Sequence, residues 1–250
     1  LSMLVALTGC ASSASRTDKA AKLELIAAAP DGNGFVERAS GRQFVPFGVN
    51  YYDPNTDWPP QVWRKFDPNH IEVHFKFMRL IGVNCARVFL TAGSFQPDVN
   101  TVDPQALAKL DRLVKIARQC GIRLILTGPD HWEGSPQYWK PDQYAGEQAV
   151  KALEHFWTVV GQRYRDEPAI FAWDLRNEPE IPWFVETWRP RWNDWLREKY
   201  VDGAGLKAAW AAELAEDEQL GSIEVPKDTA VKGNPRLLDW QRFREHLADE

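Results

Sequence analysis

The chain has 250 residues, and its 30 basic and 35 acidic side chains give a formal net charge of −5. Hydrophobic residues make up 44% of the sequence and charged residues 26%, which is typical of globular domains and argues against a disordered, collagen-like or membrane-spanning chain. The mildly acidic charge also argues against nucleic acid as a partner, because binding to a phosphate backbone depends on clustered basic side chains.

The first residues of the chain have the form of an export signal. Residues 1–7 are mostly apolar and lead into Leu7-Thr8-Gly9-Cys10, followed by small residues. This tetrapeptide resembles the lipobox of bacterial lipoproteins, and the resemblance implies cleavage before Cys10 and acylation of its thiol. We expect residues 1–9 to be a partial signal peptide, residues 10–33 a tether, and the protein to be exported and lipid-anchored to the membrane of a bacterial cell envelope, at the outer membrane or cell surface. The alternative for Cys10 is an ordinary buried cysteine.

From Gly34 onward the sequence predicts alternating strands and helices. A hairpin is predicted over residues 35–45, with its turn at Gly41. The mostly apolar segments that follow predict four strands, at residues 44–52, 83–90, 122–126 and 169–175. Apolar residues at helical spacing predict helices between them, at residues 69–81, 104–120 and 150–164. This alternation favours a parallel sheet with right-handed crossovers.

After Glu178 the alternation ends. The remaining residues predict helices at 182–200, 206–214 and 237–249, a loop over 223–236, and no fifth strand. Each strand-helix unit takes about forty residues here, whereas a closed barrel of eight units needs about 250 or more. We therefore predict an α/β fold, a (β/α)8 TIM barrel of which about the first half, strands 1–4, is present, together with a helical excursion. Residues 34–250 would form the N-terminal part of that domain, and the chain, which begins without Met and ends inside a predicted helix, would be a fragment.

In βα folds the reactive side chains gather where the strands end. Polar and aromatic residues stand at those positions after all four strands: Asn50, Tyr51 and Tyr52; Arg87; Asp130, His131 and Trp132; Asn177, Glu178 and Pro179. A carboxyl group beside an amide suits sugar chemistry, because an acid must protonate the glycosidic oxygen while polar and aromatic groups hold the ring. These residue types favour Glu178 as an acid/base and Asn177 as its orienting neighbour.

Residues 171–179, Phe-Ala-Trp-Asp-Leu-Arg-Asn-Glu-Pro, resemble the strand-four signature of clan A glycoside hydrolases, especially family 5, the cellulase and mannanase family. Residues 47–51 and 83–90 are similar to the first two strands of that family, so the likeness covers roughly residues 34–180. The resemblance implies that Glu178 is the general acid/base and that Asn177 binds the sugar at the cleavage point. It also implies that Arg87 lies near the nucleophile and that His131 is a family histidine.

Residues 195–210 are more similar to family 42 and related β-galactosidases. The resemblance implies hydrolysis with retention through a second Glu after strand seven, for which this chain has no candidate, so we expect the chain itself to be inactive. The expected substrate is a polysaccharide or oligosaccharide of the β-mannan or β-glucan class. The alternatives are an exo-acting β-galactosidase or β-mannosidase and a glycan-binding surface lipoprotein without activity. No cofactor is expected, and the oligomeric state is not predicted.

Each candidate also has a structural alternative. Glu178 could lie in a surface turn, Arg87 could form a structural ion pair, and Tyr51, His131 and Trp132 could pack the core or a loop instead of contacting substrate.

Further residues carry weaker signals. Cys85 and Cys120 have no metal-binding spacing and are expected to be core cysteines or a disulfide pair. His70 and His74 lie one helical turn apart, but Ile71 replaces the Glu of a zinc-peptidase motif, so no metal site is predicted. The tryptophans at 183, 188, 192 and 195 have the spacing of a packing face or a sugar platform, and we favour packing.

Overall fold

The computed structural model describes residues 22–130, 134, 136–139, 146–178, 183, 186–227 and 233–249. The predicted signal peptide and most of the predicted tether, with Cys10, lie outside the described residues. Within the described ranges, no helix is long and apolar enough to cross a membrane.

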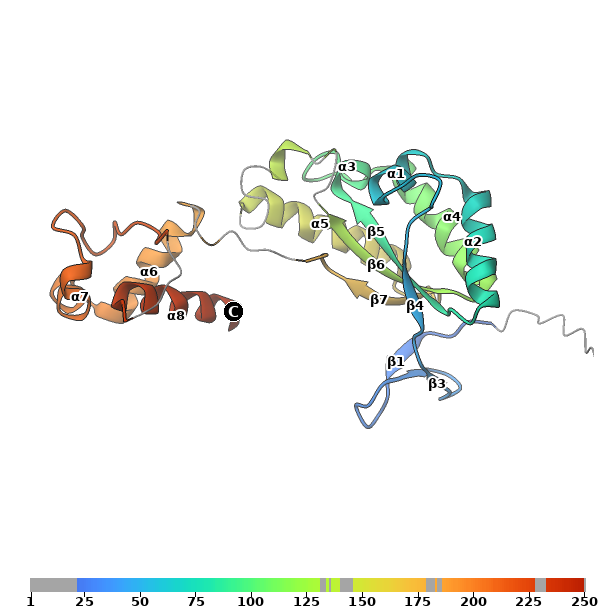
Figure 1. Ribbon diagram of the computed structural model, residues 1–250, viewed down its shortest axis with the longest axis horizontal. Helices are drawn as coiled ribbons and strands as arrows, with labels where there is room; N and C mark the ends of the chain where they lie inside the picture. Colours follow the sequence, from blue (N-terminus) through green and yellow to red (C-terminus); the bar gives the residue numbers. More distant parts are fainter. Residues whose placement is uncertain are drawn as a thin grey trace, which may run out of the picture.

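The centre of the fold is a four-stranded parallel sheet with the order β4-β5-β6-β7 (Figure 1). Its strands are β4 (Gly48–Tyr51), β5 (Cys85–Thr91), β6 (Arg123–Asp130) and β7 (Ile170–Asp174). The strand order follows the chain order, as it does in a (β/α)8 barrel, and the described residues contain no further parallel strand to close the sheet. The predicted α/β class and half barrel are confirmed.

Helices cover one face of this sheet (Figure 1). They are α1 (Pro59–Arg64), α2 (Pro68–Leu80), α3 (Ala92–Phe95), α4 (Pro104–Cys120) and α5 (Glu147–Tyr164), with a 3-10 turn η1 (Gln137–Trp139) before α5. Asp103 caps α4 by accepting from the N–H groups of Gln105 and Ala106, and Gly121 ends it in the left-handed region at φ 69°. Apolar side chains of α2, α4 and α5 form one core with those of β5 and β6.

The alternation of side chains along the strands leaves the second face of the sheet more polar. Ala86 and Val88 of β5 point into the helix-covered core, whereas Arg87 between them is only partly buried on the other face. The register places Asn50 of β4 beside Arg87, so both side chains belong to this second face.

The single strand predicted over residues 44–52 is wrong. The chain forms two strands there, β3 (Gln43–Phe44) and β4, which belong to different sheets. Pro46 lies between them and has no N–H for a continuous ladder. The amide side chain of Asn84 holds the bend, because its Nδ2 donates to the carbonyl of Val45 and its Oδ1 accepts from the N–H of Phe47, both at 2.8 Å.

A small antiparallel sheet lies at the amino ends of the parallel strands (Figure 1). It contains β1 (Ile26–Ala28), β2 (Phe35–Glu37) and β3, so the predicted hairpin is confirmed but has an additional strand. The prediction that the tether extends to residue 33 is corrected, because residues 26–28 pair with β2.

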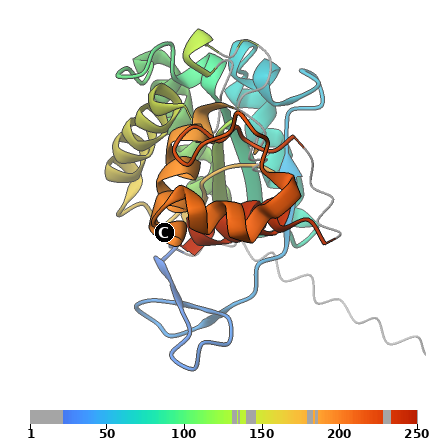
Figure 2. The same ribbon diagram turned by 90° about the vertical axis from the view of Figure 1, so that its left-hand side faces the viewer.

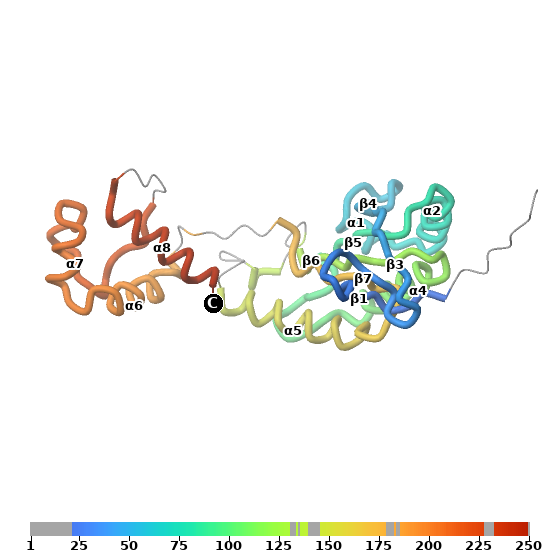
Figure 3. Tube along the Cα trace, turned by 90° about the horizontal axis from the view of Figure 1, so that it is seen from below, coloured from blue at the N-terminus to red at the C-terminus, as the bar shows by residue number. Residues whose placement is uncertain are grey.

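The last described residues form a second core. It is built by η2 (Glu186–Trp188), α6 (Arg189–Tyr200), α7 (Gly203–Trp210), η3 (Ala211–Glu213) and α8 (Pro235–Asp249). Figures 1 and 3 show these helices as a group of their own beyond one end of the sheet, and in Figure 2, viewed from that end, they lie in front of it. Trp192 is fully buried between Trp195, Trp210 and Trp240, and Trp183 and Trp188 pack against the same core. The packing interpretation of this tryptophan run is confirmed.

Cys85 and Cys120 are both buried and free, so they are core cysteines and not a disulfide pair.

Candidate active site

The polar face of the sheet has Arg87 of β5 at its centre. Its guanidinium lies over the ring of Phe89, 4.5 Å from the ring centroid, and so extends along the strand toward the carboxyl edge. There Nε and Nη2 donate to the same oxygen, Oδ2 of Asp174, at 2.9 and 2.5 Å. The ion-pair alternative for Arg87 therefore holds, but the pair stands at the predicted site and is only partly buried, with 26% of the Arg87 side chain and 30% of the Asp174 side chain exposed.

Asp174 joins three strands. It lies at the end of β7, its Oδ2 accepts from Arg87 of β5, and the same atom accepts from the hydroxyl of Thr127 of β6 at 2.9 Å. Neither Asp174 nor Thr127 is among the residues predicted from the sequence. The available signal is a single carboxylate inside an otherwise apolar strand, since an unpaired charge would be costly to bury there.

Asn177 is held by the same arginine. Nη2 of Arg87 donates to Oδ1 of Asn177 at 3.0 Å, and Nη1 reaches Oδ1 of Asn50 at 3.4 Å. Because a guanidinium can only donate, the bond fixes which end of the Asn177 amide faces it. The amide NH2 of Asn177 is therefore turned away from Arg87, where it can donate to another oxygen. Arg87 and Asn177, from the second and fourth strands, are thus in direct contact.

Glu178 follows directly and is exposed. Its backbone adopts the left-handed region with φ 43°, which is uncommon for a residue other than glycine. Left-handed residues outside glycine cost about 1 kcal/mol or more and gather at functional sites, where surrounding contacts hold them. No hydrogen bond joins its carboxylate to another described residue. Pro179, beside it, lies outside the described residues.

A second carboxyl group, Asp130, lies behind this turn at the end of β6. It is 1% exposed, and neither of its carboxyl oxygens has a hydrogen bond of normal geometry among the described residues. Burial raises the pKa of Asp130 to about 6, although the positive charge of Arg176 and the N–H of Asn177 act to lower it. Arg176 lies over the ring of Trp139, 4.6 Å from its centroid. A buried acid and a stacked arginine thus flank the backbone that carries Asn177 and Glu178.

Tyr51 is not part of this site, and the prediction that it binds substrate is corrected. It is 5% exposed, packs edge-on against Phe75 and shares a hydrogen bond of 3.1 Å between its hydroxyl and Nδ1 of His74. Side chains alternate across a strand, so Asn50 faces the site and Tyr51 the core. His74 is thus half-buried, whereas His70 is exposed beside Asp53 and Asp67.

His131 and Trp132 lie outside the described residues, so their predicted roles remain predictions. An aromatic surface of another kind is present at β7, where Trp173 is 37% exposed and stands edge-on against Trp157 with centroids 5.9 Å apart. Within the described ranges, no group of three or more His, Cys, Asp or Glu side chains could hold a metal ion.

A parallel βα sheet with its polar network at the carboxyl edge is the arrangement of (β/α)8 enzymes. Comparison with known proteins points to glycoside hydrolases. The family described as β-galactosidase, glycoside hydrolase family 42, matches residues 143–250.

Two curated relatives of this chain are mannan endo-1,4-β-mannosidases. A mannan endo-1,4-β-mannosidase F of Aspergillus clavatus is 28% identical over 175 residues, covering 60% of this chain and 40% of that protein. A mannan endo-1,4-β-mannosidase A of Podospora anserina is 27% identical over 210 residues, covering 70% of this chain and 55% of that protein. The chain spans about half the length of the curated relatives that it matches.

Among solved structures, the β-galactosidase of Rahnella sp. R3 resembles this chain with a TM-score of 0.60 and 18% sequence identity, over 80% of this chain and 31% of that one. At this identity the likeness concerns the fold alone, which is a partial (β/α)8 barrel.

Proposed function

We propose that the protein is a retaining β-glycoside hydrolase in which Glu178 is the general acid/base. In such enzymes one carboxyl group protonates the glycosidic oxygen and later activates water, while a second forms a covalent bond to the sugar. The first of these roles goes to Glu178, and the second carboxyl group is not assigned among the described residues.

The observation that carries this proposal is the hydrogen bond from Arg87 to Oδ1 of Asn177. It fixes the amide so that its NH2 can donate to a sugar hydroxyl next to the exposed Glu178 carboxyl. Arg87 has a further role in the proposal, because its positive charge would stabilise the negative charge of a nucleophile on the same face. Asp174 and Thr127 hold the guanidinium in place for both roles.

The proposed substrate is a β-linked mannan or glucan, as polysaccharide or oligosaccharide. The similarity of the chain to endo-mannanases supports this class. An exo-acting β-galactosidase or β-mannosidase is the second candidate, supported by the family 42 match over residues 143–250. A surface lipoprotein that only binds glycan is less well supported, because the tryptophans that would form its platform are packed in a helical core.

We also propose that Cys10 carries a lipid anchor that attaches the exported protein to the bacterial cell envelope. This rests on the lipobox-like Leu7-Thr8-Gly9-Cys10. Radioactive palmitate incorporated by the wild type and not by Cys10→Ser would support it, and equal labelling of the two would exclude it.

The hydrolase proposal is tested with aryl β-mannosides and β-galactosides and with mannopentaose. The complete product of the gene should release the β-anomer first, as followed by NMR, and Glu178→Gln should abolish turnover of mannopentaose, whose leaving group needs protonation. Release of the α-anomer first, or full activity in Glu178→Gln, would contradict the proposal. Products separate the two candidates, because an exo-enzyme releases only single sugars from mannopentaose. We expect the 250-residue chain alone to show no turnover. Measurable turnover by this chain that the Glu178→Gln substitution abolishes would overturn that expectation.

A further inference from the structure

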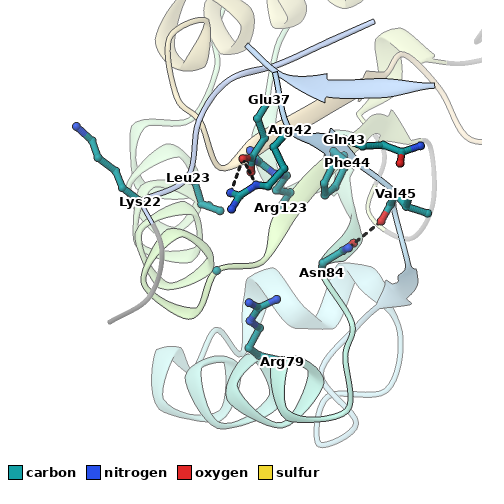
Figure 4. A pocket seen from close by; sticks show the side chains of 11 residues that line it. Lys22, Leu23, Glu37, Arg42, Gln43, Phe44, Val45, Arg79, Asn84 and Arg123 are labelled. Carbon is teal, nitrogen blue, oxygen red and sulfur yellow. Dashed lines mark hydrogen bonds and ion pairs between the residues drawn. The ribbon is translucent and has the colours of Figure 1, made fainter. Parts of the chain in front are cut away.

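The amino end of the parallel sheet holds a cavity of about 410 Å³ that the proposed reaction does not use (Figure 4). It lies between the small antiparallel sheet, the end of α2 and the residues that precede β5 and β6. Arg123 in its wall begins β6, and Asp130 at the proposed active site ends that strand. Seven residue steps of about 3.3 Å separate the two ends by about 23 Å, so the cavity and the active site are distinct.

Most charges around this cavity are positive. Four cationic side chains line it, those of Lys22, Arg42, Arg79 and Arg123, against the single carboxylate of Glu37. The local formal charge is thus +3, in a chain whose formal net charge is −5. A concentration of positive charge in a concave site with low-dielectric walls attracts anions.

Two of these cations have structural partners. Nη2 of Arg123 donates to Oε1 of Glu37 at 2.8 Å, and its Nη1 donates to the backbone carbonyls of Glu24 and Pro168. Arg123 is 1% exposed, so it contributes charge but has little capacity to bind a ligand. Arg42 also pairs with Glu37, through Nε at 2.7 Å, but 61% of its side chain is exposed.

Arg79, like Lys22, has no hydrogen-bond or ion-pair partner among the described residues. It stands in the last turn of α2 and is exposed. Its side chain passes over Gly121, where an added Cβ would lie 3.7 Å from Nε. Figure 4 shows the guanidinium of Arg79 extending from the helix into the cavity, toward the side on which Arg42 and Arg123 lie, while Lys22 stands at the rim.

We propose that this cavity binds a phosphate ester, with Arg79 and Arg42 as the guanidinium donors. Guanidinium groups bind phosphate oxygens through paired, charge-assisted hydrogen bonds. The excess charge of +3 suits a phosphate, and the volume leaves room for a small polar substituent beside it. Glu37 does not oppose such a ligand, since two arginines already neutralise it. The phosphate ester can come from the glycerophosphate headgroup of an anionic lipid or from a soluble metabolite.

The position of the cavity is consistent with the lipid source. Lys22 at the rim is twelve residues after Cys10, and an extended segment of that length spans about 40 Å. A lipid anchor at Cys10 would therefore keep the cavity within reach of headgroups.

The test uses the full 250-residue chain with Cys10→Ser, which prevents acylation. Calorimetry at low ionic strength measures binding of sn-glycerol 3-phosphate, and co-sedimentation measures binding to vesicles of phosphatidylcholine with or without phosphatidylglycerol. We expect saturable binding of glycerol phosphate that Arg79→Ala weakens about tenfold or more, because a charged hydrogen bond contributes about 1.5–3 kcal/mol. Arg79→Lys keeps the charge but loses the paired donors, so its affinity for glycerol phosphate should lie between those of the parent and of Arg79→Ala.

Arg165→Ala is the matched control, because it removes an exposed arginine that does not line the cavity and pairs only with the exposed Asp166. Its binding should equal that of the parent. Binding to phosphatidylglycerol vesicles that also depends on Arg79 identifies the lipid source, and binding of glycerol phosphate alone identifies the soluble one. No saturable binding of glycerol phosphate, or equal losses in Arg79→Ala and Arg165→Ala in variants that melt at the parent temperature, would overturn the proposal.

Discussion

Arg87 and Asp174 connect the second and fourth strands of the parallel sheet across the strand that lies between them. Both Nε and Nη2 of the arginine donate to one carboxylate oxygen, and Thr127 of the intervening strand donates to that same oxygen. The arginine then has Nη2 in contact with Asn177 as well. One ion pair thus ties three strands together and also positions the residue beside the proposed acid/base.

This ion pair should contribute measurably to stability. Because both side chains are about a quarter to a third exposed, solvent screening reduces the effect, and we expect Asp174→Ala to lower the free energy of unfolding by about 1–3 kcal/mol. Asp166→Ala removes the acid of the surface-exposed pair with Arg165. It should change the free energy of unfolding by less than about 0.5 kcal/mol. Urea denaturation followed by tryptophan fluorescence measures both. Equal changes in the free energy of unfolding for the two substitutions would show that the Arg87–Asp174 pair does not stabilise the fold.

Asn177 offers a substitution that separates structure from binding. Asn177→Asp keeps an oxygen to accept from Arg87 but removes the NH2 donor that faces away from it. We expect stability equal to or slightly above the wild type, and kcat/KM for an aryl β-glycoside lower by about 100-fold, since a lost donor to a transition-state oxygen costs about 2.7–4 kcal/mol. Asn33→Asp, in the exposed turn between β1 and β2, is the control. An unchanged kcat/KM in Asn177→Asp would remove Asn177 from the site.

The raised pKa of Asp130 predicts a pH dependence of stability with a definite sign. An acid whose pKa rises from about 4 in the unfolded chain to about 6 in the fold contributes stability that is present below pH 4 and is lost as the pH rises through 6. The loss over that window is on the order of 2–3 kcal/mol. Asp130→Asn cannot titrate, so the difference in unfolding free energy between the two proteins should change by about this amount between pH 4 and pH 7. Parallel curves for the two proteins over this range would contradict the buried-acid description.

Several elements of the fold were predictable because single residues carried clear local signals. Asp103 followed by Pro104 sets the start of α4, and Gly121 in the left-handed region sets its end. The apolar runs at β5, β6 and β7 likewise identify strands buried in a parallel sheet. Pro46 was the signal that the first strand is interrupted, and the apolar run around it obscured the change of sheet.

The site was predictable only to the level of strand ends. Arg87, Asn177 and Glu178 follow from position, but the choice between Asn50 and Tyr51 depends on which face each occupies, and a shift of one residue exchanges the two faces. The role of Asp174 depends on contacts across three strands, and the sequence pattern within one strand does not indicate such contacts. Arg79 and Arg42 come together only because the antiparallel sheet folds against the amino end of the parallel one.

The most direct test of the role of Glu178 is azide rescue. In the complete gene product, Glu178→Ala should turn over a dinitrophenyl β-glycoside slowly, because that leaving group needs no acid to form the glycosyl-enzyme but water lacks its base. Added azide, which needs no general base, should accelerate turnover and yield the β-glycosyl azide, identified by NMR. Glu186→Ala, which removes an exposed glutamate of η2, should behave as the wild type. Activity of Glu178→Ala that is unaffected by azide, with no glycosyl azide formed, would contradict the assignment.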